Sequence, residues 1–287
     1  MAARTVRLAL VQMPCADAPA RNLERALAHV ADAARGGANL VVLPELFLGP
    51  YFCQRPDDTS AFDLAESVPG PTTQALSKAA ARHRVTLVGG SVFERADGKF
   101  YNTASVFLPD GSVAGHYRKT HIPEDILYHE QRYFAPGDTG VRVFDTPAGK
   151  VAPLICYDQW YPEAARLATL AGAEVLAYPT AIGVIDSHVE ENITGDWEGM
   201  WRAAQVGHAA ANNVYVAAVN RVGKEGAITF WGGSFVSGPD AAVLAKGGGG
   251  EQVVFADCDL SRVKALQAAW RFLPNRRPSE YAGLSRS

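Results

Sequence analysis

The sequence predicts a mixed α/β domain built in layers. Apolar runs typical of buried strands alternate with amphipathic segments along most of the 287 residues. Turn residues join some of these runs, for example at 109–112, so the predicted sheets are not purely parallel. Because no long linker interrupts the pattern, we expect a single domain over 1–287, with a polar, proline-containing tail from about residue 271.

In the first half of the chain, each predicted element has a local signal. The apolar run at 6–12 is typical of a strand, and an amphipathic helix at 21–34 ends before two glycines. Pro44 stops the next strand, at 40–43. The same periodicities predict a helix at 71–83 and strands at 86–93, 101–108 and 113–117.

The second half continues the alternation. A short buried strand at 151–155 is followed by Cys156, and Pro162 opens a helix at 162–170 because proline suits the first helical turn. Further elements follow from apolar periodicity: strands at 174–178, 215–220, 230–236, 242–245 and 252–257, and helices at 197–211 and 260–269.

Composition excludes several classes of function. The formal net charge of −3 gives no electrostatic support for a nucleic-acid partner, and no apolar run approaches the length of a membrane span. The four cysteines form no CxxC pair, so neither a disulfide framework nor a structural metal site is expected. We therefore expect a reducing, cytoplasmic setting and a small-molecule substrate.

Three reactive side chains each lie within two residues of the end of a predicted strand: Glu45, Lys119 and Cys156. Taken singly, they are most often a surface carboxylate, a solvated lysine and a buried apolar thiol. Ligands of α/β sheets gather beyond the carboxyl ends of strands, so the three side chains can converge in one pocket. It is their combination that favours a catalytic site.

These residue types suit hydrolysis by a thiol nucleophile. At a strand-to-helix turn, Cys156 lies near backbone N–H groups, which favour a thiolate and stabilise an oxyanion. Glu45, among apolar and aromatic neighbours, is partly desolvated and becomes a stronger general base. The ammonium group of Lys119 would stabilise both thiolate and oxyanion.

The chain resembles the nitrilase superfamily of carbon–nitrogen hydrolases from Val6 to about Val263. The resemblance rests on three segments in the family's order: LPELF around Glu45, YRKTHIP around Lys119 and CYDQWYPE around Cys156. It implies a four-layer αββα sandwich, a Glu–Lys–Cys catalytic triad, no metal or organic cofactor, and assembly as a homodimer or larger homo-oligomer.

The family also places a second glutamate shortly after the lysine. Glu130 is the expected residue, and its role would be to hold Lys119 and the substrate amide in place. Glu124 is the alternative, although its context is typical of a loop or cap residue.

The residues after the cysteine sort substrates within this superfamily. Gln159 and Trp160 stand where some members carry arginines that bind a substrate carboxylate. The segment CYDQWYPE instead looks like the N-carbamoylputrescine amidase branch, which implies hydrolysis of N-carbamoylputrescine to putrescine, ammonia and carbon dioxide through a cysteine thioester. The expected substrate contacts are Tyr51, Tyr157, Trp160, Thr180 and Trp197.

A cationic substrate tail needs acidic or aromatic walls, and the segment 183–200 offers both. Trp197 is its aromatic candidate, and its acidic candidates are Asp186, Glu190, Glu191, Asp196 and Glu198. A solvated acidic loop is the alternative interpretation of the same residues.

Two other functions stay open from the sequence. One is hydrolysis of another substrate, such as an N-carbamoyl-β-amino acid or an ω-amide, with Arg202 or Arg132 binding its carboxylate. The other is a non-catalytic scaffold on the same fold, which the presence of all three triad residues disfavours.

Overall fold

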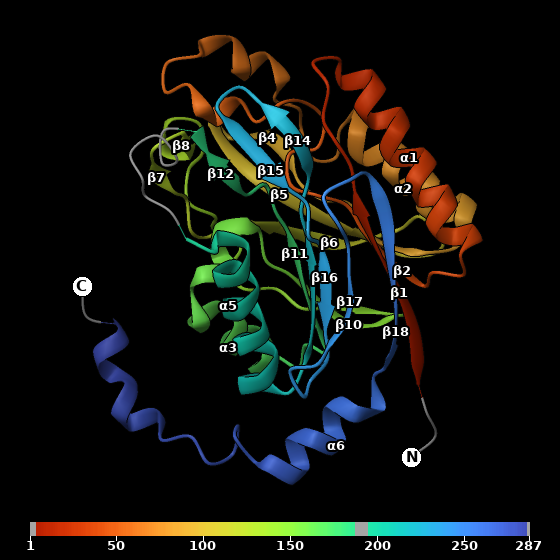
Figure 1. Cartoon of the computed structure of the whole chain (residues 1–287), viewed down its shortest axis with the longest axis vertical. Helices are drawn as coiled ribbons and strands as arrows, with labels where there is room; N and C mark the ends of the chain where they lie inside the picture. The colour runs from red at the N-terminus through yellow and green to blue at the C-terminus, as the bar shows by residue number, and fades with distance from the viewer. Residues whose placement is uncertain (1–3, 187–194, 286–287) are drawn as a thin grey trace.

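The computed structural model describes residues 4–186 and 195–285. Two large sheets pack face to face, and helices cover the outer face of each sheet (Figure 1). The order of layers is therefore helix, sheet, sheet, helix, which confirms the expected αββα sandwich.

The first sheet has seven strands in the order β18-β1-β2-β3-β5-β4, with β6 also paired to β5. The C-terminal strand β18 runs antiparallel beside the N-terminal strand β1, from Thr5 opposite Asp259 to Gln12 opposite Gln252. The strand bounds are β1 Thr5–Gln12, β2 Leu40–Val42, β3 Thr86–Val88, β4 Val92–Ala96, β5 Lys99–Phe107, β6 Val113–Arg118 and β18 Gln252–Asp259.

The second sheet has six strands in the order β17-β16-β13-β11-β10-β9. Its centre is parallel, because β11 pairs in parallel with both β10 and β13. The bounds are β9 Phe144–Thr146, β10 Gly149–Pro153, β11 Val175–Pro179, β13 Tyr215–Val219, β16 Phe235–Ser237 and β17 Val243–Lys246.

Side-chain alternation along the strands builds the layers. In β1, Leu8 and Leu10 pack against the second sheet, whereas Ala9 and Val11 pack against helices α1 and α2. Apolar residues of α3 and α5 join the core on the outer face of the second sheet. The helix bounds are α1 Pro19–Arg35, α2 Pro71–His83, α3 Pro162–Leu170, α5 Trp197–Asn212 and α6 Ser261–Trp270.

Two small sheets lie at one end of the sandwich, toward the top of the view in Figure 1. One has the order β12-β15-β14, and the other is the two-stranded pair β7-β8. Their bounds are β7 Glu124–Asp125, β8 Tyr128–His129, β12 Gly183–Ile185, β14 Val222–Glu225 and β15 Ile228–Trp231.

Two strands predicted as continuous are each divided in the structure. The run at 86–93 forms β3 and β4, separated by Gly89, Gly90 and Ser91. Gly90 has φ +63°, and a Cβ there would lie 2.2 Å from the carbonyl oxygen of Pro44. The run at 230–236 is likewise divided between β15 and β16, which belong to different sheets.

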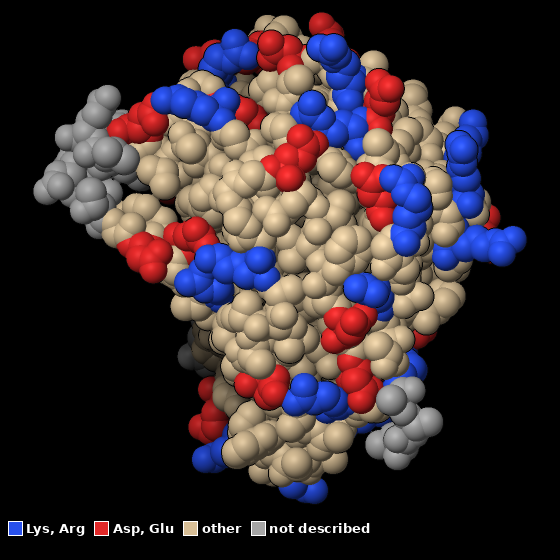
Figure 2. Space-filling model, turned by 45° about the vertical axis from the view of Figure 1, so that its right-hand side comes forward, with Lys and Arg blue, Asp and Glu red and all other residues tan. Residues whose placement is uncertain are grey.

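The C-terminal segment lies outside the layered body of the molecule. Residues after α6 lead away from the layered body toward the short 3-10 helix Pro278–Ser285 (Figure 1). On the face shown in Figure 2, acidic and basic side chains are interspersed. Within the described part of the chain, no helix is both long and apolar enough to cross a bilayer.

Candidate active site

Cys156 lies at a sharp turn between strand β10 and helix α3. It is the first residue of a 3-10 turn, Cys156–Trp160, and its backbone has φ +41°, a conformation that costs free energy for a residue with a Cβ. The buried carboxylate of Asp158 holds the turn, accepting hydrogen bonds from Ile155 N at 2.8 Å and from the Tyr117 hydroxyl at 2.7 Å. The thiol is therefore fixed by the backbone of its own turn.

Glu45 follows β2 and is fully buried. Its Oε1 accepts hydrogen bonds from Asn102 Nδ2 at 2.8 Å and from Lys119 Nζ at 2.8 Å. Its Oε2 is buried and has no hydrogen-bond partner among residues 4–186 and 195–285. One carboxylate oxygen is thus anchored, and the other is free to accept a proton.

Lys119 is buried at the end of β6 and binds two carboxylates. Its Nζ lies 2.8 Å from Glu45 Oε1 and 2.7 Å from Glu130 Oε2. Burial alone would lower the pKa of Lys119, but the charges of Glu130 and Glu45 raise it well above its ordinary value. Lys119 is therefore a fixed cation at neutral pH.

Of the two candidate second glutamates, Glu130 is the one beside Lys119. It is fully buried, and its Oε1 also accepts a hydrogen bond from the Tyr51 hydroxyl at 2.6 Å. Glu124 is exposed and pairs with His129 at 3.0 Å and with Arg132 at 3.4 Å. The structure thus gives Glu130, and not Glu124, the place expected for the second glutamate.

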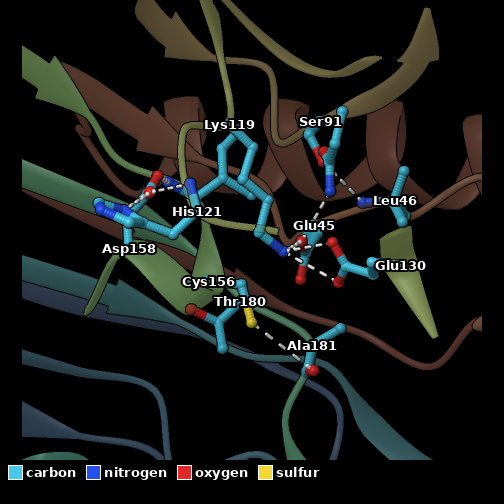
Figure 3. A network of polar contacts seen from close by, with 12 residues as sticks. Glu45, Leu46, Ser91, Lys119, His121, Glu130, Cys156, Asp158, Thr180 and Ala181 are labelled. Carbon is cyan, nitrogen blue, oxygen red and sulfur yellow. Dashed lines mark hydrogen bonds and ion pairs between the residues drawn. The ribbon is translucent and has the colours of Figure 1, made fainter. Parts of the chain in front are cut away.

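Figure 3 shows Cys156, Glu45, Lys119 and Glu130 converging on one space, with the sulfur on one side and the ion-paired groups on the other. The thiol makes a weak contact with Ala181 O at 3.8 Å. Burial, and then the negative charge of Glu45, raise the pKa of the Cys156 thiol well above its ordinary value, although Lys119 opposes them. The resting thiol is therefore protonated, and it needs a base to react.

A family model for carbon-nitrogen hydrolases matches residues 7–268 of this chain. This chain belongs to the carbon-nitrogen hydrolase family. It is therefore an enzyme that hydrolyses carbon–nitrogen bonds of amide or carbamoyl groups. The resemblance to the nitrilase superfamily is confirmed. The alternative of a non-catalytic scaffold is therefore set aside.

Three curated relatives of this hydrolase have different names. It is 40% identical to an N-carbamoylputrescine amidase of Solanum lycopersicum, covering 97% of this chain and 94% of the relative. Identity to a citrullinase of Francisella tularensis is 36%, covering 96% of each chain. Identity to an omega-amidase of Mus musculus is 37%, covering 96% of this chain and 97% of the relative.

Two solved structures share its fold. A carbon-nitrogen hydrolase from Helicobacter pylori G27 superposes with a TM-score of 0.91 at 38% identity, covering 99% of both chains. A mutant amidase of the nitrilase superfamily from Nesterenkonia sp. AN1 gives a TM-score of 0.79 at 25% identity, covering 97% of this chain and 96% of its own. That amidase carries the acetamide moiety of fluoroacetamide covalently on its active-site cysteine.

The hydrolase has a cavity of about 350 Å³ above Cys156. Three of the five predicted substrate contacts line it: Tyr157, Trp160 and Trp197. The other two are not among its lining residues. Tyr51 donates its hydroxyl to Glu130, and the Thr180 hydroxyl lies 3.1 Å from Tyr178 O. Direct substrate contact by any of the five stays a prediction.

The predicted acidic wall is largely occupied by internal contacts. Asp186 pairs with Lys224 at 2.9 Å, Asp196 accepts from Gly199 N at 2.8 Å at the start of α5, and Glu198 pairs with Arg202 and Lys246. None of the three lines the cavity. The other two acidic candidates, Glu190 and Glu191, lie outside the described residues.

Arg221 is a site residue that the sequence reasoning missed. It is fully buried, and its guanidinium donates to Glu45 O at 2.7 Å and to Leu46 O at 2.8 Å while pairing with Glu225 at 2.9 Å. It fixes the backbone that carries the carboxylate of Glu45. A charged residue two positions after the apolar run 214–219 was the signal that could have identified it.

Proposed function

We propose that this hydrolase converts N-carbamoylputrescine to putrescine, ammonia and carbon dioxide. The charge of the site carries the proposal, because the ammonium group of Lys119 is already bound to two carboxylates. Among the described residues that line the cavity, there is no lysine or arginine. A substrate with an ammonium tail fits this environment, whereas a substrate carboxylate would lack a partner. The 40% identity to an N-carbamoylputrescine amidase supports the same choice.

The chemistry begins with attack of Cys156 Sγ on the carbamoyl carbon. Glu45 takes the thiol proton, and Lys119 with the backbone N–H of Tyr157 stabilises the tetrahedral oxyanion. Glu45 then protonates the leaving nitrogen, so ammonia departs and an N-substituted carbamoyl thioester remains. Water, deprotonated by Glu45, attacks the thioester carbon and breaks its bond to Cys156 Sγ, which regains a proton from Glu45. The released carbamate decomposes to carbon dioxide and the free amine.

The two arginines that could favour a carboxylate substrate are both engaged elsewhere. Arg202 pairs with Glu198 at 3.2 Å, and Arg132 pairs with Glu124 at 3.4 Å. Neither lines the cavity. Citrulline has the same carbamoyl end and amine as N-carbamoylputrescine but adds a carboxylate. Comparing the rates of hydrolysis of these two compounds therefore isolates the effect of the carboxylate.

A substrate panel tests the proposal. We expect kcat/KM for ammonia release from N-carbamoylputrescine to exceed that from citrulline, N-carbamoyl-β-alanine and a simple ω-amide by more than about tenfold, because an unpaired carboxylate in the cavity costs at least about 1.4 kcal/mol. Faster release from any of the carboxylate substrates would overturn the assignment and favour the corresponding alternative.

The pH dependence should report the ionisation of Glu130. Burial raises the pKa of Glu130 to about 7, although Lys119 and the Tyr51 hydroxyl lower it. As a carboxylate Glu130 holds Lys119, so we expect kcat/KM to fall as the pH decreases through about 7. Tyr51→Phe removes a hydrogen bond that favours the charged form, so the acid limb should move to higher pH by about half a unit to one unit.

Tyr133→Phe is the matched control for this shift, because the Tyr133 hydroxyl donates to Arg55 O and not to the Glu130 carboxylate. The backbone hydrogen bond from Tyr133 N to Glu130 O, at 3.0 Å, is kept by phenylalanine. Its profile should coincide with that of the wild type. An acid limb that stays in place in Tyr51→Phe would show that Glu130 does not govern it.

Assembly and location stay predictions. Exposed apolar side chains on α3 and at the C-terminal end support the expected homodimer or larger homo-oligomer: Leu167, Leu170, Trp270 and Phe272. All four cysteines are free thiols, which suits the reducing cytoplasm proposed for the enzyme.

A further inference from the structure

The small β7-β8 hairpin brings a carboxylate to the cavity that contains the reactive thiol. Asp125 in β7 pairs with Tyr128 in β8, and both residues line this cavity together with Cys156. Strand β7 has only two residues, Glu124–Asp125, and the turn after it includes Leu127 with φ +61°. The tight hairpin therefore fixes the position of Asp125 in the cavity lining.

The charge of Asp125 is not neutralised within the described chain. Its Oδ1 accepts a hydrogen bond from Ile126 N at 2.8 Å, and no Lys, Arg or His of residues 4–186 and 195–285 forms an ion pair with it. Its neighbour Glu124, in contrast, pairs with both His129 and Arg132. The other acidic residue of the cavity lining, Glu130, is already bound by Lys119.

The rest of the cavity wall is mostly apolar and aromatic. Trp160, Trp197 and Trp231 line it with Asp125. Aromatic faces attract cations and so add to the attraction of a carboxylate for an ammonium group, although Asp125 is itself exposed. An amine of ordinary basicity is protonated at neutral pH, and a cavity lined by one unpaired carboxylate and three tryptophans suits it.

We propose that Asp125 binds the terminal ammonium group of the substrate and gives the enzyme its preference for cationic over neutral and anionic tails. The inference rests on the proposed function, because it assigns a partner to the amine of N-carbamoylputrescine. Asp125 takes no part in the bond-breaking steps at Cys156.

The test compares Asp125→Asn on two substrates that differ only at the tail. N-pentylurea replaces the terminal ammonium of N-carbamoylputrescine with a methyl group. We expect Asp125→Asn to lower kcat/KM for N-carbamoylputrescine about fivefold or more, mainly through KM, and to leave kcat/KM for N-pentylurea within about twofold. Asparagine keeps an oxygen that can accept from Ile126 N, so the hairpin is preserved.

Glu124→Gln is the control, since it removes a carboxylate from the same strand but outside the cavity lining. It should leave both substrates unaffected. Equal losses on both substrates in Asp125→Asn, or no loss on either, would overturn the role of Asp125. If the wild type itself does not prefer N-carbamoylputrescine to N-pentylurea, the proposed function fails.

A binding measurement separates these two failures. Calorimetry with putrescine on Cys156→Ala and on Cys156→Ala/Asp125→Asn needs no turnover. A dissociation constant about fivefold weaker or more in the double variant supports the ammonium site whatever the physiological substrate is. Equal affinities in the two proteins refute it.

Discussion

Cys156→Ala is expected to abolish ammonia release while leaving the fold intact. The proposed mechanism uses this sulfur as the nucleophile, and no other thiol lines the cavity among the described residues, so we expect kcat to fall by more than about 10⁴-fold. Structural cost should be small, because the only hydrogen bond of the thiol within residues 4–186 and 195–285 is the weak one to Ala181 O at 3.8 Å, and alanine keeps the Cβ in the core. Ammonia release and thermal unfolding followed by circular dichroism measure the two effects.

Cys258→Ala is the matched control, since Cys258 is also a fully buried thiol but lies in β18, away from the cavity. Its activity should stay within about twofold of the wild type. An alanine at position 156 that turned over substrate at a near-normal rate would end the thioester mechanism.

Lys119→Met should have the next largest effect, on activity and stability together. The substitution leaves Glu45 and Glu130, both fully buried, without the ammonium group that lies 2.8 Å and 2.7 Å from them. Removing one partner from a buried ion pair costs about 3–5 kcal/mol of unfolding free energy. We also expect kcat to fall by more than about 10³-fold, because the oxyanion loses its cation. Urea unfolding and ammonia release are the measurements.

Two further variants sharpen this prediction. Lys150→Met removes a half-exposed lysine that pairs with Asp145 at 3.1 Å, and it should cost less than about 1 kcal/mol. Lys119→Met/Glu130→Gln removes one of the stranded carboxylates, so it should recover part of the stability and none of the activity. A single variant Lys119→Met as stable as the wild type would contradict the ion-pair geometry.

The core of the site was predictable because its three residues mark strand ends. Glu45, Lys119 and Cys156 each follow a predicted strand. The site forms where the ends of β2 and β6 in the first sheet face the turn after β10 in the second sheet. The resemblance then supplied Glu130, which no periodicity marks. The αββα order also came from the resemblance, since alternating strands and helices alone do not say how two sheets pack.

Other features depend on tertiary contacts that a pattern does not contain. The divisions at 89–91 and 232–234 arise where chain segments approach each other closely and require glycine, although the apolar pattern continues across them. The hydrogen bond from the Tyr51 hydroxyl to Glu130 joins residues far apart in the sequence, and no local pattern predicts it. Asp125 escaped notice because a two-residue strand has no recognisable period.

The pairing of β18 with β1 has a consequence for how the enzyme becomes competent. The first sheet, which carries Glu45 and Lys119, acquires its edge strand only when residues 252–259 have been synthesised. Cys156, which follows β10 of the second sheet, is synthesised well before these residues. Until then β1 is an unpaired edge, so the nascent chain lacks a complete first sheet even after Glu45, Lys119, Glu130 and Cys156 have all been synthesised.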